Sequence, residues 1–299
     1  MNLLNISIIT YNDLDNLKKQ LDLFSSITLP SDVKILIYDN CSDYDIFHEL
    51  SCYKNIVIYR HQQNIGGDEN IYFAYKSSKS KWTWVLSTND FIKPKLLLDL
   101  IDNLRNNRSL ALFMHSNKTG ELFKVNNLKY YQSRYERLFH ISFIIVNTSL
   151  IQNKFHLYNK YIVTQQAQFY FLLELFIEQN ENNHTFYFIK LNMFSYTSNP
   201  AWNKLIFLNS NLKILDILTK NEFNTIILHY GNFFLRTYLF IIYLGYKDGT
   251  FAKKNYILKK YFKVYFQPSL NSYKLIYPLL LILKINLNMI ISKRFIRKP

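Results

Sequence analysis

Polar side chains that can bind a ligand follow three predicted buried strands, at the point where each strand ends. They are Tyr11-Asn12, Asp39-Asn40 and Thr88-Asn89-Asp90. Carboxylates and hydroxyls form hydrogen bonds with ring N–H groups and sugar hydroxyls, and a carboxylate also suits a hard divalent cation. Parallel sheets bind ligands at the carboxyl ends of their strands. The pattern therefore predicts a binding site at one sheet edge, although Asn and Asp are also ordinary turn formers.

The elements that would position these side chains alternate between strands and helices. Short apolar runs rich in β-branched residues indicate buried strands, and apolar residues spaced by three and four indicate helices. This alternation predicts an α/β fold with a mostly parallel sheet flanked by helices. The predicted strands are 5–10, 33–38, 55–60, 82–86 and 110–114, and the predicted helices are 14–24, 68–78 and one that Pro94 opens.

The pattern changes after residue 114. We expect a strand over 138–147, a helix over 162–180, a strand over 185–190 and a polar loop over 195–204. From residue 204 onward the pattern is helical and strongly aromatic. We therefore predict a ligand-binding domain over 1–200 and a helical region over 201–299, in which Trp202 would contact an acceptor or anchor the core.

The basic charge of the chain is concentrated at its end. The net charge is +15, but residues 251–299 hold eleven Lys or Arg and no acidic residue. This segment interleaves Lys with aromatic residues, which favours contact with an anionic membrane surface. A solvated or partner-binding helical face is the second interpretation, and nucleic-acid binding is the third.

Composition and motifs exclude several other classes. With 49% hydrophobic and 17% aromatic residues, the chain is not mainly disordered. The two cysteines, Cys41 and Cys52, are too few for a disulfide framework and indicate free thiols in a reducing cytoplasm. The seven histidines lack the spacing of a zinc site, and we expect neither a signal peptide nor a membrane span.

Four motifs in order give these residues a context. They are Ser7–Asn12 (SIITYN), Tyr38–Asp43 (YDNCSD), Asn64–Asn70 (NIGGDEN) and Trp82–Asp90 (WTWVLSTND). The series resembles the nucleotide-binding half of inverting family-2 glycosyltransferases with the GT-A fold, and is most similar to the bacterial branch that builds O-antigen and capsule.

The resemblance implies a role for each motif residue. Thr10, Tyr11 and Asn12 would line the nucleotide pocket, and Asp39 would accept hydrogen bonds from the base or ribose. Near the ribose and sugar, the wall would be formed by Asn64, Gly66, Gly67 and Asp68. Thr88, Asn89 and Asp90 occupy the place of an Asp-any-Asp motif, in which Asp90 would ligate Mg²⁺ or Mn²⁺ on the donor diphosphate.

The chain departs from the family pattern at two points. Thr88 stands where the metal motif has its first acid, and its hydroxyl lends no charge, so metal affinity without donor should be weak. The catalytic base would fall in Thr164–Gln168, where Gln166 cannot take a proton near neutral pH. Glu174, Glu178, a base from elsewhere, a glutamine that positions the acceptor, or an inactive enzyme remain open.

The resemblance thus implies a metal-assisted, inverting glycosyltransferase. It would move a sugar from a nucleoside-diphosphate donor to a saccharide, expected to be lipid-linked, at the inner face of the plasma membrane. A non-catalytic GT-A-like protein that binds a nucleotide or a partner is the alternative. An adaptor that uses only segment 251–299 is a third hypothesis, and we expect no nucleic-acid partner.

Overall fold

The computed structural model describes residues 1–106, 111–114, 122–125, 141–164, 166–181, 186–189 and 194–196. The chain divides into two compact units, 1–210 and 211–299. The second unit lies outside the described residues, and so do Trp202 and the basic segment 251–299. No helix within the described ranges is long and apolar enough to cross a membrane.

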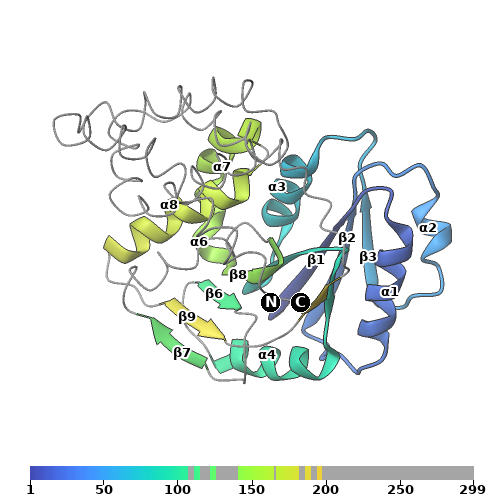
Figure 1. Cartoon of the computed structure of the whole chain (residues 1–299), viewed down its shortest axis with the longest axis horizontal. Helices are drawn as coiled ribbons and strands as arrows, with labels where there is room; N and C mark the ends of the chain where they lie inside the picture. The colour runs from blue at the N-terminus through green and yellow to red at the C-terminus, as the bar shows by residue number, and fades with distance from the viewer. Residues whose placement is uncertain are drawn as a thin grey trace, which may run out of the picture. The chain divides into compact units, whose positions relative to one another are not determined.

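An eight-stranded sheet forms the centre of the first unit (Figure 1). Its order is β3-β2-β1-β4-β8-β6-β9-β7, and the first four strands are mutually parallel. β8 runs antiparallel to both β4 and β6, and β7 runs antiparallel to β9. The strands are β1 Leu4–Thr10, β2 Val33–Asp39, β3 Ile56–Arg60, β4 Trp82–Ser87, β6 Ala111–Met114, β7 Leu122–Val125, β8 Ile144–Asn147 and β9 Phe186–Ile189.

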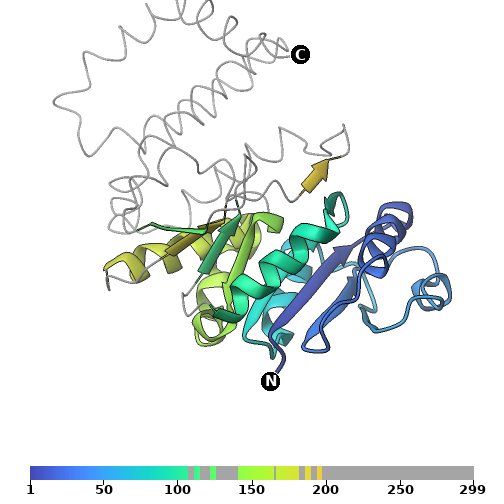
Figure 2. The same cartoon turned by 90° about the horizontal axis from the view of Figure 1, so that it is seen from below.

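Helices cover both faces of the parallel part, which explains its continuous apolar strands. Three helices do most of this: α1 (Leu14–Ser25), α3 (Gly67–Ser77) and α4 (Pro94–Asn106). The chain steps from β1 to β2 in one direction and from β3 to β4 in the other. Right-handed crossovers therefore place α1 and α3 on opposite faces. Figures 1 and 2 show α4 on the face that α1 covers, where Arg105 pairs with Asp32 at 2.9 Å.

Aromatic side chains join α3 to the later helices. Tyr75 of α3, Tyr158 of α7 (Phe155–Tyr161) and Phe171 of α8 (Ala167–Glu181) are all fully buried. The ring centroids of Tyr158 and Phe171 lie 5.3 Å apart. Each such aromatic pair stabilises the fold by about 1 kcal/mol, in addition to the stabilisation from the apolar area that it buries. These three rings pack α3 against α7 and α8.

The remaining elements are short. They are α2 (Ile46–Glu49), β5 (Asp90–Ile92), α6 (Thr148–Gln152), β10 (Phe194–Tyr196) and the 3-10 turns Ile141–Phe143 and Ile162–Thr164.

The early strands and helices match the sequence prediction to within about two residues, but three later predictions are wrong in part. The helix expected over 162–180 begins only at Ala167, because Ile162–Thr164 form a 3-10 turn in which the Thr164 hydroxyl donates to the Tyr161 carbonyl at 2.6 Å and accepts from the Gln166 N–H at 3.1 Å. The strand expected over 138–147 begins only at Ile144, because Ser142 serves the tight turn before it: its carbonyl accepts from Trp84 Nε1 at 2.7 Å. The loop expected over 195–204 is wrong at its start, because Ser195 and Tyr196 belong to β10, which pairs antiparallel with β5. Residues 138–140 and Pro200 lie outside the described residues.

Candidate functional site

The loops after β1 and β2 are tied together at the carboxyl edge of the sheet. The backbone N–H of Asn12 donates to Ser42 Oγ at 2.9 Å, and Asn12 Nδ2 donates to Asp43 Oδ2 at 2.8 Å. Asn12 has a φ of 51°, a left-handed conformation that Asn tolerates. Tyr11 is 47% exposed beside it, while Thr10 Oγ1 is buried without a hydrogen-bond partner. Asn12 therefore joins the β1 end to the β2 loop, and Tyr11 beside it is accessible to a ligand.

Asp39 lies beneath this edge rather than on it. Its side chain is fully buried, and its Oδ1 accepts from Ser42 Oγ at 2.5 Å. Arg60 of β3 lies 3.4 Å from Asp39 Oδ2 and donates to the carbonyls of Tyr44 and Ser42 at 2.6 Å each. A nucleotide would therefore contact the Asp39 carboxylate only if the turn that holds Ser42 moves.

Asn40 joins the β2 end to the predicted sugar wall. Its Nδ2 donates to Asn64 Oδ1 at 2.8 Å, and its Oδ1 accepts from the N–H of Ile65 at 2.9 Å. Asn64 Oδ1 also accepts from the N–H of Gly66 at 2.9 Å. Gly66 has a φ of 91°, which other residues rarely adopt, and Gly67 would meet nothing within 4 Å if it carried a Cβ. The exposed wall residues are thus held beside β2, with open space at the second glycine.

Asp68 contacts the start of α8, where the family base was expected. Its Oδ2 accepts from the backbone N–H of Ala167 at 3.0 Å, and its carbonyl accepts from the Tyr158 hydroxyl at 2.9 Å. Gln166 is only 5% exposed, and its Oε1 is buried without a partner. The structure therefore brings Asp68 close to Gln166, but the side-chain amide oxygen of Gln166 does not face solvent.

Of the two α8 carboxylates named as candidate bases, the structure describes the side chain of Glu174. Glu174 accepts from the Tyr161 hydroxyl and pairs with Lys160 at 3.3 Å. These contacts hold it in the packing of α7 against α8. The Glu178 side chain lies outside the described residues.

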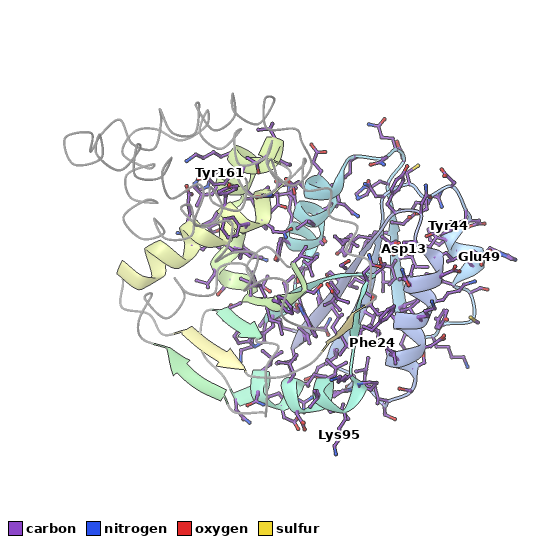
Figure 3. All side chains as sticks on the ribbon, viewed as in Figure 1. Asp13, Phe24, Tyr44, Glu49, Lys95 and Tyr161 are labelled. Atoms are coloured by element: carbon purple, nitrogen blue, oxygen red, sulfur yellow. The ribbon has the colours of Figure 1, made fainter. Side chains whose placement is uncertain are left out.

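The β4–β5 turn, which carries the predicted metal motif, is tied to α1. The Thr88 hydroxyl donates to Asp13 Oδ2. Asn16 Nδ2 donates to Asp13 Oδ1 at 2.9 Å and to Asn89 Oδ1 at 3.0 Å. Figure 3 shows Asp13 at the sheet side of the start of α1. Asp90 is 8% exposed.

Gln20 fixes the backbone of the same turn from within α1. Its Nε2 donates to the carbonyl of Asp90 at 3.0 Å and more weakly to that of Ser87 at 3.4 Å. Gln20 is fully buried. The position of Asp90 is therefore set by a core side chain as well as by strand pairing.

The donor set of this turn fits a hard divalent cation. Carboxylates of Asp13 and Asp90 and the hydroxyl of Thr88 are all oxygen ligands of the kind that Mg²⁺ and Mn²⁺ prefer. Among the described residues, no three His, Cys, Asp or Glu side chains gather into a metal-binding group. Mg²⁺ commonly binds through one or two carboxylates plus substrate phosphates and water.

Two residues that build the site, Asp13 and Arg60, were not selected from the sequence. Asp13 directly precedes the predicted helix 14–24, where an Asp is common as an ordinary helix cap. Arg60 gave no signal, because a basic residue at a strand end is common on solvated surfaces. Their roles depend on contacts between segments that are up to 75 residues apart.

Burial keeps the phenols near the site protonated. Burial raises the pKa of Tyr158 well above its usual value, and the nearby charge of Asp68 raises it further. Burial likewise raises the pKa of Tyr38, which lies one residue before Asp39. Neutral phenols can donate hydrogen bonds, as Tyr158 does to the Asp68 carbonyl.

Comparisons with known proteins identify the family and the fold. The family profile described as "Glycosyl transferase family 2" matches residues 6–166. S. aureus TarS residues 1–349 in complex with UDP-GlcNAc superposes with a TM-score of 0.57 and 12% identity, covering 89% of this chain and 81% of that one. The same TarS fragment with UDP gives 0.53 and 14% identity, covering 77% and 70%. No curated protein matches the chain significantly in sequence. The predicted GT-A fold is confirmed.

Proposed function

Because the chain belongs to glycosyltransferase family 2, we propose that it transfers a sugar from a nucleoside-diphosphate donor to an acceptor hydroxyl, at the carboxyl edge of its sheet. One observation carries the proposal. Side-chain hydrogen bonds join the ends of β1 and β2 to the Asn64–Gly67 segment, while the β4–β5 turn is held beside them from α1. The family's donor-binding motifs thus lie along one edge. The complexes of TarS with UDP and UDP-GlcNAc support a nucleotide-sugar donor.

The exposed residues suggest how the donor would lie. Tyr11 and Asn12 would contact the nucleoside, with the exposed ring of Tyr11 available to stack on the base. Asp39, held by Ser42 and Arg60, would accept from a base N–H after the 40–42 turn shifts. The open backbone at Gly67 would permit close approach of the ribose or sugar.

Asp90 and Thr88 would hold the divalent cation and its water at the donor diphosphate. A cation there stabilises the negative charge that develops on the leaving diphosphate. In the inverting reaction that we propose, the oxygen of the acceptor hydroxyl attacks the anomeric carbon, and the hydroxyl proton passes to a base or to water. The bond from that carbon to the diphosphate oxygen breaks, and the nucleoside diphosphate leaves with the electron pair. The chain contributes mainly positioning and charge complementarity.

We further propose a lipid-linked saccharide acceptor in bacterial surface-polysaccharide assembly of the O-antigen or capsule type, with the protein peripheral at the inner face of the plasma membrane. The support is the charge of segment 251–299, because each basic residue near an anionic leaflet contributes about 1 kcal/mol. The full chain should sediment with anionic vesicles, and a variant with Lys253, Lys254, Lys259 and Lys260 changed to Gln should sediment less. Equal sedimentation of both would refute this attachment.

A second function is favoured by the start of α8. Residues 164–168 (TQQAQ) contain no carboxylate, and Gln166 is buried. A protein that binds a nucleotide sugar or a partner without turnover would need no base. Multiple turnovers of donor would exclude this second function.

A thermal-shift panel tests donor binding. UDP, GDP, CDP and dTDP are compared with and without Mn²⁺. A ligand at a hundredfold excess over its Kd stabilises the folded state by about 2.7 kcal/mol. That corresponds to a Tm rise of roughly 5–10 °C for a domain of this size. We expect one nucleotide to give such a shift with Mn²⁺ and to lose it in Asp90→Asn. No shift with any of the four would contradict the proposed donor site.

A further inference from the structure

We propose that Asp13 supplies the negative charge that the metal motif lacks at Thr88, so that two segments rather than one form the cation site. This inference rests on the proposed function, since it concerns the cation that accompanies the donor. In the family pattern one short motif carries both acids. Here one acid stays in the β4–β5 turn as Asp90, and the other comes from the connection between β1 and α1.

The hydrogen bonds aim the Asp13 carboxylate at the turn. Oδ2 accepts from the Thr88 hydroxyl, and Oδ1 accepts from Asn16 Nδ2 at 2.9 Å. That same Asn16 nitrogen lies 3.0 Å from Asn89 Oδ1, to which it also donates. Both carboxylate oxygens are therefore engaged with the residues that surround the first position of the metal motif.

Asp13 also departs from the usual behaviour of its position. It is the N-cap of α1, where an Asp side chain ordinarily accepts from an N–H of the first helical turn. Its side chain makes no such bond. A missing cap costs about 1 kcal/mol. Local rules are broken most often where a residue serves a function, and the contact made instead is with Thr88.

The bond to Asp13 prepares the Thr88 oxygen for a ligand. The Thr88 hydroxyl has one hydrogen, and this hydrogen points at the carboxylate. Its oxygen lone pairs can then coordinate a cation or accept from a cation-bound water. Negative charge passed through a charge-assisted hydrogen bond makes that oxygen a better donor to a cation. Thr88 with Asp13 thus replaces the missing acid in both geometry and charge.

A purely structural tie between α1 and the turn is the competing explanation, and charge separates the two. Asp13→Asn keeps an oxygen that can accept from Thr88 but removes the charge. Asp13→Asn with Thr88→Asp moves the carboxylate to the family position. Asp15→Asn removes the same charge from the first turn of the same helix, where Asp15 is exposed, and serves as the matched control.

The experiment measures the apparent Kd of Mn²⁺ for the full chain in the presence of UDP, by calorimetry or by the EPR signal of free Mn²⁺, with Tm as the folding check. Loss of an outer-shell partner typically weakens metal binding by about 10–100-fold. We expect that loss in Asp13→Asn, no change in Asp15→Asn, and recovery to within about tenfold of the original value in Asp13→Asn/Thr88→Asp.

Each other outcome has a distinct meaning. Equal Mn²⁺ affinity of Asp13→Asn and Asp15→Asn would overturn the inference while leaving the donor site intact. If Asp13→Asn loses its fold, a folded double variant that does not regain Mn²⁺ affinity overturns the inference instead. If the unaltered chain binds none of UDP, GDP, CDP and dTDP in the presence of Mn²⁺, the proposed function is refuted, and the role of Asp13 is refuted with it.

Discussion

The buried pair of Arg60 and Asp39 should be the most sensitive polar contact of the nucleotide half. Arg60→Leu removes a cation 3.4 Å from a fully buried carboxylate. It also removes the donors to the carbonyls of Ser42 and Tyr44. Breaking a buried pair costs about 3–5 kcal/mol, but the Arg60 side chain is 28% exposed and water lowers that figure. We expect about 3 kcal/mol of lost unfolding free energy.

A double-mutant cycle isolates the charge. Asp39→Asn leaves an amide that still accepts from Ser42 but needs no cation. The Asp39→Asn/Arg60→Leu variant should therefore recover about half of the loss, because its interior holds no unpaired charge. Arg60→Lys keeps the charge without the two-pronged geometry and should fall between the original chain and Arg60→Leu.

Urea unfolding followed by circular dichroism measures these differences, and nucleotide binding is measured on the variants that stay folded. Loss of about 3 kcal/mol corresponds to a Tm decrease of roughly 6–12 °C. An Arg60→Leu variant within about 0.5 kcal/mol of the original chain would refute the reasoning. So would a double variant less stable than Arg60→Leu, since relief of the buried charge could then not be the dominant effect.

Two further predictions concern α8 and alkaline pH. Asp68→Ala should cost about 1 kcal/mol because the Ala167 N–H loses its acceptor, whereas Asp68→Asn should cost less; equal losses in urea unfolding would contradict the capping role. Burial raises the pKa of Tyr75 and Tyr158, so the unfolded phenols ionise first, near pH 10. The free energy of unfolding should therefore be constant up to about pH 10 and then fall by about 1.4 kcal/mol per pH unit for each tyrosine. Urea midpoints at rising pH measure this fall. Tyr75→Phe should make the fall less steep, and an unchanged slope in that variant would contradict the prediction.

Local sequence patterns predicted the elements that frame the site. Strand periodicity and flanking polar residues located β1, β2 and β4, because a buried parallel strand has a simple apolar signature. The same alternation implied the sheet edge at which Asn12 and Asp90 lie. The elements of one βα unit can therefore largely be predicted from the sequence.

Contacts between segments far apart in the sequence could not be predicted from such local patterns. Asp68 and Ala167 are 99 residues apart, and their bond depends on how α3 packs against α8. Asp13 and Thr88 meet because β1 and β4 are neighbours, a pairing that neither residue signals. Asp39 is buried beside Arg60, its partner on the neighbouring strand β3. Tertiary packing decides these positions, so the sheet edge could be predicted from the sequence, whereas the hydrogen bonds between its segments could not.

Sustained release of nucleoside diphosphate is the most direct test of sugar transfer. The full chain is incubated with Mn²⁺ and with UDP-, GDP- or dTDP-sugars, alone and with short saccharide acceptors. We expect one donor class to turn over many times per protein molecule, and Asp90→Asn to slow that turnover by roughly 100-fold without unfolding the chain. Binding without turnover, or an Asp90→Asn variant as fast as the original chain, would contradict the account.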